Sequence, residues 1–202
     1  MNNQDLYQHL DQTMGFGSKE IAQAFKKINR ADFVPKAYQA EAYYDYPLPI
    51  AEEQTISQPS TVLFMLNLLG PKKSEKILDV GSGSGWTTAL LARIVGSGGE
   101  VSGVEVVPDL IKFGQKNLKK YHFKHASISK AGKKIGWSEK APFDKILVSA
   151  TAENLPQELI DQLKVGGVLV IPIHHSVWKI IKLSETETKQ EEFPGFAFVP
   201  LK

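Results

Sequence analysis

The chain has 202 residues, of which 42% are hydrophobic and 23% charged, with a formal net charge of +2. These proportions exclude a disordered or collagen-like protein. It contains no cysteine, which excludes disulfides, thiolate metal sites and a cysteine nucleophile. The longest nearly pure apolar stretch, Val165 to Ile173, has nine residues, whereas a membrane-spanning helix needs about 20. Because the N-terminus also lacks a secretory signal pattern, we expect a cytoplasmic protein without a membrane partner. We also expect a monomer.

The positive charge is concentrated in one segment. Between Lys112 and Lys145 there are ten lysines and only two acidic residues, Glu139 and Asp144. Such a segment either forms solvated helix faces and loops or attracts an acidic peptide or nucleic acid. We favour the first interpretation and expect no nucleic-acid partner.

Residues 1–40 are predicted to be mainly helical, with Ile21, Phe25 and Ile28 on one face. Residues 43–59 are rich in proline and aromatic residues and lack clear periodicity, which predicts an ordered loop that crosses a site. A further helix is predicted to begin at Pro59 and to end at Gly70–Pro71.

From residue 71 onward, predicted strands and helices alternate. The predicted strands cover 76–80, 99–105, 124–129, 143–150, 168–173 and 177–183, and the predicted helices cover 84–95, 108–120 and 156–163. This alternation predicts a parallel sheet that is covered on both faces. The link between the last two strands is too short for a helical crossover, so the C-terminal strand should be antiparallel. Residues 196–201 could add an edge strand. We expect a single domain over 1–202, in which 1–70 form an N-terminal helical extension and active-site loop and 71–202 form the α/β core.

A glycine-rich turn follows the first predicted strand of this core. It reads Asp79-Val80-Gly81-Ser82-Gly83-Ser84-Gly85. The carboxyl end of a parallel strand is where α/β sheets bind nucleotides. Glu105 ends the next strand, 20 residues beyond Gly85, where a carboxylate can accept both hydroxyls of a ribose.

The spacing of the glycines separates two classes of cofactor. The dinucleotide fingerprint is G-x-G-x-x-G, whereas Gly81, Gly83 and Gly85 follow G-x-G-x-G. Asp79 would repel a pyrophosphate but suits the cationic amino-acid part of S-adenosylmethionine. The whole pattern looks like motif I of the class I methyltransferases. A tight strand–helix turn without any ligand is the third possibility.

Further motifs along essentially the whole chain resemble the protein-L-isoaspartate (D-aspartate) O-methyltransferase family. The block Thr55-Ile56-Ser57-Gln58-Pro59 is specific to that family. The motifs occur in family order and comprise 33–35 (FVP), 44–45 (YD), 47–50 (PLPI), 54–59 (QTISQP), the glycine loop, 136–137 (GW), 141–144 (APFD), 162–167 (QLKVGG), 171–172 (IP) and 198–201 (FVPL). The resemblance implies a three-layer, Rossmann-like α/β fold of class I, with a mostly parallel sheet, an antiparallel C-terminal strand and an N-terminal helical extension.

The resemblance also implies a reaction. A methyl group passes from S-adenosyl-L-methionine to the carboxylate of an L-isoaspartyl or D-aspartyl residue in damaged peptides and proteins, leaving S-adenosyl-L-homocysteine and starting repair. The acceptor carboxylate is ionised at pH 7, so no strong general base is required. Positioning of the reactants would then supply most of the catalysis.

The resemblance assigns roles to individual residues. Ser57, together with Thr55, is expected to orient the reacting carboxylate; this pair could also serve as a helix N-cap before Pro59. The implied cofactor-binding residues are Gln54, Thr55, Ile56, Ser57, Asp79, Gly81, Ser82, Gly83, Gly85, Glu105, Val106, Ala131 and Gly132. No metal is expected.

Two departures from the family pattern within the chain, and a third at its end, leave alternatives open. Ala51-Glu52-Glu53 replaces a glycine-containing turn, and Lys130-Ala131-Gly132 replaces a motif whose aspartate contacts adenine. The sequence also ends at Lys202, directly after VPL, where the family commonly continues for a few residues that touch the site. The chain could therefore methylate another carboxylate, or bind the cofactor without catalysis. Methylation of a nucleic-acid base is disfavoured, because residues 149–152 read SATA where such enzymes carry a motif of the N-P-P-Y type.

Overall fold

The structure is a computed structural model that describes residues 1–201. Its α-helices are α1 (Asn3–Thr13), α2 (Lys19–Lys27), α3 (Pro59–Leu69), α4 (Trp86–Val95), α5 (Pro108–Lys119) and α6 (Gln157–Asp161), with short 3-10 helices at Arg30–Phe33, Lys36–Glu41 and Ser138–Lys140. The strands are β1 (Leu48–Ala51), β2 (Gln54–Ile56), β3 (Lys76–Val80), β4 (Glu100–Glu105), β5 (Ala126–Lys130), β6 (Phe143–Val148), β7 (Leu163–Ile173), β8 (Ser176–Lys182) and β9 (Thr188–Pro194). No helix in this part of the chain is long and apolar enough to span a membrane.

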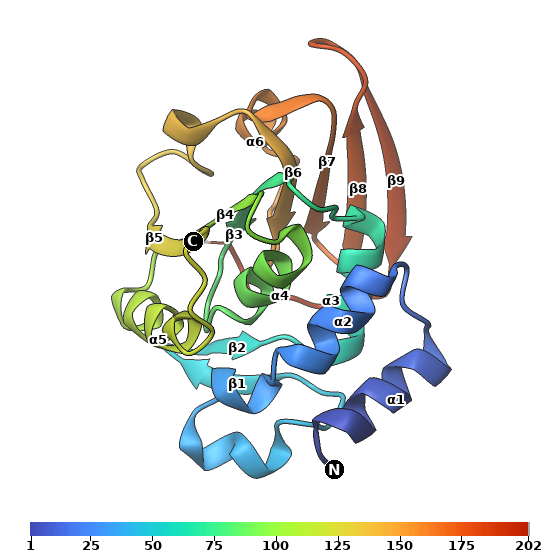
Figure 1. Ribbon diagram of the computed structural model, residues 1–202. Coiled ribbons are helices and arrows are strands. Elements are labelled where there is room, and N and C mark those ends of the chain that lie inside the picture. Colours follow the sequence, from blue (N-terminus) through green and yellow to red (C-terminus); the bar gives the residue numbers. More distant parts are fainter. Residues whose placement is uncertain (202) are drawn as a thin grey trace.

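Seven strands form one sheet in the order β5-β4-β3-β6-β7-β8-β9 (Figure 1). The pairs among β3, β4, β5, β6 and β7 are parallel, whereas β8 is antiparallel to both β7 and β9. The predicted fold, a mostly parallel sheet with an antiparallel strand near the C-terminus, is therefore confirmed.

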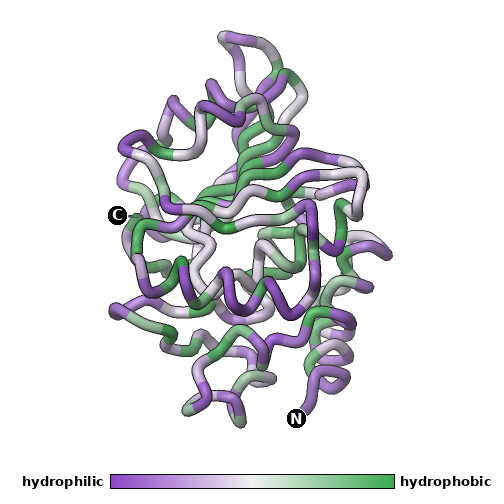
Figure 2. Tube along the Cα trace, turned by 60° about the vertical axis from the view of Figure 1, so that its left-hand side comes forward, coloured by the Kyte–Doolittle hydropathy of each residue, from purple (hydrophilic) through white to green (hydrophobic). Residues whose placement is uncertain are grey.

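The sheet separates two hydrophobic cores, because successive residues of a strand point to opposite faces. Ile77 of β3 packs into a core shared with α1 to α4, whereas its neighbour Leu78 packs into a core that includes Leu159 of α6. Figure 2 shows the hydrophobic segments gathered in the sheet and the hydrophilic segments on the outer loops. Leu6 of α1 belongs to the same buried cluster as Ile77, because α1 and α2 pack on α3 and α4, which cover this face of the sheet.

Residues 43–59 differ from the prediction. They contain the antiparallel hairpin β1–β2 instead of an irregular loop, with Leu48 paired to Ile56. The turn residues Glu52 and Glu53 have φ values of 49° and 58°. Hairpin turns with two positive φ angles normally use Asn or Gly, so a Glu-Glu turn carries no hairpin signal in the sequence.

The C-terminal region also differs in two places. The helix predicted over 156–163 ends earlier, because α6 covers only Gln157–Asp161 and β7 already begins at Leu163. Gly166 and Gly167 lie inside β7, where the pairing with β6 shifts between Phe143 and Lys145. The edge strand is β9, not the expected 196–201. β9 is largely solvated and reads TKQEEFP, so it lacks the apolar alternation on which strand prediction depends. Charged residues on such an edge discourage pairing with another chain.

Candidate active site

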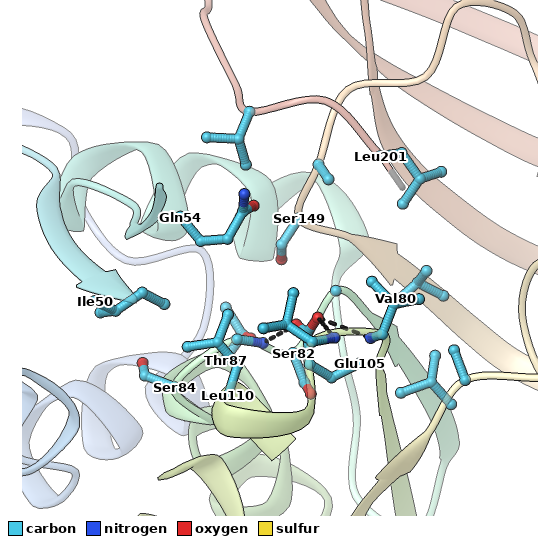
Figure 3. Close-up of a pocket in the computed structure, with 18 of the residues that line it drawn as sticks. Ile50, Gln54, Val80, Ser82, Ser84, Thr87, Glu105, Leu110, Ser149 and Leu201 are labelled. Atoms are coloured by element: carbon cyan, nitrogen blue, oxygen red, sulfur yellow. Dashed lines mark hydrogen bonds between the residues drawn. The ribbon is translucent and has the colours of Figure 1, made fainter. Parts of the chain in front are cut away.

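A cavity of about 350 Å³ lies between the β1–β2 hairpin and the carboxyl ends of β3, β4 and β6 (Figure 3). This is the edge of the sheet at which α/β proteins bind ligands. The walls come from the hairpin, the glycine loop, the end of β4, the segment after β5, the end of β6 and the C-terminal segment. Its lining includes Ile50, Gln54, Thr55, Ile56, Ser57, Gly81, Ser82, Gly83, Trp86, Thr87, Glu105, Val106, Leu110, Ala131, Gly132, Lys133, Lys134, Ser149, Val199, Pro200 and Leu201.

The glycine loop forms the floor of this cavity and joins β3 to α4. Gly83 has a φ of 52°, and a Cβ atom there would lie 3.4 Å from the Ile50 Cδ1 atom of the hairpin. Gly85 has a different role, because a Cβ atom there would lie 2.9 Å from Ile128 Cδ1 and 3.1 Å from the Gly114 carbonyl oxygen. The third glycine therefore permits the close approach of α4 to α5 and does not line the cavity.

Among the residues that line the cavity, Glu105 is the acidic one. Its Oε2 atom accepts a hydrogen bond of 2.9 Å from the Gly83 amide, and its Oε1 atom accepts bonds of 2.8 and 3.0 Å from the Val106 and Val107 amides (Figure 3). Only 6% of the residue is exposed. Three of the roughly four lone-pair sites of this carboxylate are therefore filled, and Oε2 keeps one for a hydroxyl group of a ribose.

Asp79 lies beneath the glycine loop and is not part of the cavity wall. Its Oδ2 atom accepts hydrogen bonds from Thr87 Oγ1 at 2.7 Å and from Thr88 Oγ1 at 2.6 Å. Burial raises the pKa of the Asp79 carboxyl to about 6, despite these two hydrogen bonds. Its Oδ1 atom is buried and has no partner within residues 1–201. The expected contact between Asp79 and a cationic amino group remains a prediction.

The hairpin supplies the opposite wall, and Figure 3 shows Gln54 across the cavity from Glu105. Thr55 and Ser57 both line the cavity. The Ser57 carbonyl oxygen accepts a hydrogen bond of 3.1 Å from Arg30. The Ser57 hydroxyl makes no hydrogen bond to another described residue, which leaves it available to a ligand. The N-cap alternative lacks support, because α3 has no side-chain cap and its cap residue is Gln58.

Eleven of the thirteen predicted cofactor-binding residues lie in this cavity wall, and only Asp79 and Gly85 do not. Sequence reasoning missed the C-terminal segment. The Thr151 amide donates to the Val199 carbonyl at 2.9 Å, and the Leu201 amide donates to the Thr151 carbonyl at 2.9 Å. These bonds hold residues 199–201 against the cavity. The FVPL motif was visible in the sequence, but its spacing did not link it to Glu105 and the hairpin, which lie more than 90 residues away.

The two departures from the family pattern within the chain occupy different places. Glu52 and Glu53 are exposed at the hairpin tip and do not line the cavity. Their charges are therefore kept out of the site. Ala131 does line it, directly after β5, and its amide donates to the Glu105 carbonyl at 2.9 Å. Lys133 and Lys134 complete this part of the wall, which therefore lacks a carboxylate acceptor for an adenine amino group.

These groups fit S-adenosylmethionine. Glu105 offers an acceptor for a ribose, Val106 and Leu110 offer an apolar wall for a base, and the glycine loop admits close approach of a ligand. The unpartnered Oδ1 atom of Asp79 is buried behind the same loop, and its contact with the cationic amino group stays a prediction. When bound, S-adenosylmethionine supplies an electrophilic methyl on a sulfonium centre.

Comparison with known proteins agrees with this site. The family model described as "Protein-L-isoaspartate(D-aspartate) O-methyltransferase (PCMT)" matches residues 1–202. The chain is 39% identical to the protein-L-isoaspartate O-methyltransferase of Methanopyrus kandleri over 189 residues, which cover 91% of this chain and 84% of that protein. It is 37% identical to the enzyme of the same name from Fervidobacterium nodosum over 200 residues, covering 98% and 100% of the two chains.

Solved structures give the same result. A protein-L-isoaspartate O-methyltransferase structure superimposes with a TM-score of 0.89 at 25% identity, covering 99% of this chain and 66% of that one. A beta-aspartate methyltransferase (PCMT) from Plasmodium falciparum superimposes with a TM-score of 0.85 at 26% identity, covering 100% and 99% of the two chains. That structure is a complex with S-adenosyl-L-homocysteine.

Proposed function

The chain belongs to the protein-L-isoaspartate(D-aspartate) O-methyltransferase family, and we propose that it methylates isoaspartyl residues of damaged peptides and proteins with S-adenosyl-L-methionine as the donor. The relatives that carry this name match the chain over most of their own length. The proposal covers the substrate class and the roles of individual residues.

One observation carries this proposal. The family-specific segment from Gln54 to Ser57 and the carboxylate of Glu105 line the same cavity, although they are far apart in the sequence. Glu105 is suited to the nucleoside part of the donor, and the hydroxyls of Thr55 and Ser57 are suited to a carboxylate. The cavity thus has one wall for a methyl donor and one for a carboxylate acceptor.

In this reaction the main task of the protein is to position the two reactants. An oxygen of the acceptor carboxylate forms a bond to the methyl carbon as the bond from that carbon to sulfur breaks, which gives a methyl ester and S-adenosyl-L-homocysteine. No proton is transferred in this step. The Ser57 hydroxyl donates a hydrogen bond to one carboxylate oxygen and thereby aims the other, while the hairpin covers the cavity and excludes water.

The decisive experiment uses methyl-labelled S-adenosyl-L-methionine with two matched peptides, one with L-isoaspartate and one with L-aspartate at the same position. Base-labile label on the isoaspartyl peptide alone supports the proposal. Label on both peptides would indicate a methyltransferase for other carboxylates. Binding of S-adenosyl-L-homocysteine without label on either peptide would indicate a cofactor-binding protein without this activity.

The role of Ser57 can be tested separately. Ser57→Ala should lower kcat at least tenfold while changing the Kd of S-adenosyl-L-homocysteine less than threefold, because the hydroxyl acts on the acceptor. Ser60→Ala is the matched control, since the Ser60 hydroxyl accepts a hydrogen bond from Gln58 at 2.8 Å and lies outside the cavity wall. Equal losses of turnover and cofactor affinity in Ser57→Ala would contradict the assigned role.

A further inference from the structure

Arg30 is completely buried, with 0% of its surface exposed. Its guanidinium donates hydrogen bonds to four backbone carbonyl oxygens. The acceptors are Ala42 at 2.9 Å, Tyr44 at 3.3 Å, Tyr46 at 3.1 Å and Ser57 at 3.1 Å. It forms no salt bridge with any residue in 1–201. A single buried cation thus connects the segment before the hairpin to the residue that follows β2.

A buried cation without a direct carboxylate partner is expensive, because desolvation disfavours the charged form. Burial lowers the pKa of Arg30 to about 10, so the side chain remains charged at neutral pH. The negative charge of Asp45 partly offsets this lowering of the Arg30 pKa, and the Asp45 Oδ1 atom accepts a bond of 2.8 Å from the Ser60 amide. The planar guanidinium can serve several carbonyl oxygens at fixed angles, whereas a lysine ammonium cannot span the same set.

Arg30 also contacts the donor side of the cavity. The central carbon of its guanidinium lies 5.4 Å from the centre of the Trp86 ring. Trp86 begins α4 directly after the glycine loop, is 2% exposed and lines the cavity. The Arg30 side chain therefore touches both walls, the Ser57 backbone on one side and the Trp86 ring on the other.

The same side chain holds two exposed aromatic residues in place. Tyr44 and Tyr46 stack on each other with ring centres 5.8 Å apart, and they are 43% and 39% exposed. Their carbonyl oxygens and that of Ser57 share one guanidinium. The stacked pair is thus fixed relative to the residue that is expected to orient the acceptor.

We propose that Arg30 is a positioning residue that sets Ser57 at a fixed distance from the glycine loop. The expected effect on turnover rests on the proposed function, that is, on methylation of an isoaspartyl peptide. Ser57 contributes its hydroxyl to the acceptor, and Arg30 acts through the Ser57 backbone. The loss of Arg30 should therefore impair use of the peptide more than binding of the cofactor.

Lys182 is the matched control, because it is also a buried cation but lies away from the cavity. It is 3% exposed, donates to the Leu163 carbonyl at 3.1 Å and pairs with Glu185 at 2.8 Å. It lies on β8, outside the cavity wall. Lys182→Met should lower thermal stability while leaving kcat/KM for the isoaspartyl peptide within threefold of wild type.

The test compares Arg30→Lys and Arg30→Met with Lys182→Met in the full chain. In Arg30→Lys, kcat/KM for the isoaspartyl peptide should fall at least tenfold, while the Kd of S-adenosyl-L-homocysteine changes less than threefold. The double variant Arg30→Lys with Ser57→Ala should show a smaller fold-decrease in kcat/KM than the product of the two single fold-decreases. Both changes act on one acceptor contact, so their effects are not independent. A kcat/KM within threefold of wild type, or an equal loss of cofactor affinity, would overturn the proposal.

Hydrogen exchange provides a readout that needs no activity. The amides of residues 42–58 should exchange at least tenfold faster in Arg30→Lys than in wild type, with no such change in Lys182→Met. Unchanged exchange would overturn the positioning role even if activity fell. Absence of methyl transfer by wild type would refute the proposed function, whereas faster exchange would still show that Arg30 fixes Ser57.

Discussion

Thr88 donates a hydrogen bond of 2.6 Å to the carboxylate of Asp79, and this bond ties the first turn of α4 to the last residues of β3. Both residues are completely buried. The glycine loop between them is therefore anchored from below, while its upper surface faces the cavity. This anchor contains an ionisable group with a perturbed pKa, so its consequences can be measured by titration.

Asp79 should make the unliganded protein less stable as the pH rises. Its pKa in the folded state is raised to about 6, so the folded protein binds a proton that the unfolded chain has already released near pH 4. The resulting stabilisation is complete below about pH 4 and is lost as the pH rises through about 6. The difference in free energy of unfolding between wild type and Asp79→Asn should therefore change by about 2 kcal/mol between pH 4 and pH 7. Parallel curves would contradict the raised pKa.

Cofactor affinity should show the opposite dependence on pH if Asp79 faces the amino group of the ligand. A cationic group near the unpartnered Oδ1 atom favours the ionised carboxylate, so binding should weaken as the pH falls below about 6. Calorimetry with S-adenosyl-L-homocysteine should give a Kd about tenfold higher at pH 5 than at pH 7. In Asp79→Asn the Kd should be nearly constant over this range, and a constant Kd in wild type would exclude the contact.

Gly85→Ala should be strongly destabilising through packing. The new Cβ atom would lie 2.9 Å from Ile128 Cδ1 and 3.1 Å from the Gly114 carbonyl oxygen, at a φ of 87°. Left-handed strain and overpacking each cost on the order of 1–3 kcal/mol. Gly96→Ala is the control, because its φ is 66° and nothing lies within 4 Å. Chemical denaturation should show Gly85→Ala to be the more destabilising by at least about 1 kcal/mol, and equal losses would contradict the packing role.

The hairpin tip should be stabilised by glycine. Glu53 has a φ of 58°, a region that costs a non-glycine residue roughly 1–2 kcal/mol. Glu53→Gly should therefore be more stable than Glu53→Ala by about 1 kcal/mol in thermal unfolding. Both variants remove the same charge, so the difference isolates backbone conformation. A more stable alanine variant would show that the turn does not adopt this conformation.

Ala131→Asp should restore an acceptor on the wall that adenine is expected to occupy. Leaving a buried amino group unpaired costs about 1–3 kcal/mol, so the Kd of S-adenosyl-L-homocysteine should fall about fivefold or more. The control is the analogue in which inosine replaces adenosine and the amino group is absent. Its Kd should not improve. An equal gain for both ligands, or none for either, would show that residue 131 does not face the amino group.

Local patterns in the sequence were sufficient for the central strands and the helices between them. β3 and β6 carry apolar residues at successive positions, 77–78 and 146–148, because both faces of the sheet are covered. Pro59 and Gly70 delimit α3 through constraints that are local to each residue. The glycine loop and Glu105 were also predictable, since the carboxyl ends of neighbouring parallel strands meet at one edge.

The tertiary structure alone decided which distant segments meet. The residue types of Glu52 and Glu53 carry no local signal for the positive φ angles of the hairpin turn, because tertiary context overrides their preference for negative φ. It also could not show that Gly85 serves helix packing, that residues 199–201 close the cavity, or that Arg30 binds the Ser57 carbonyl. Each of these depends on atoms that are brought together only by folding, and hydrophobic periodicity carries no information about such contacts.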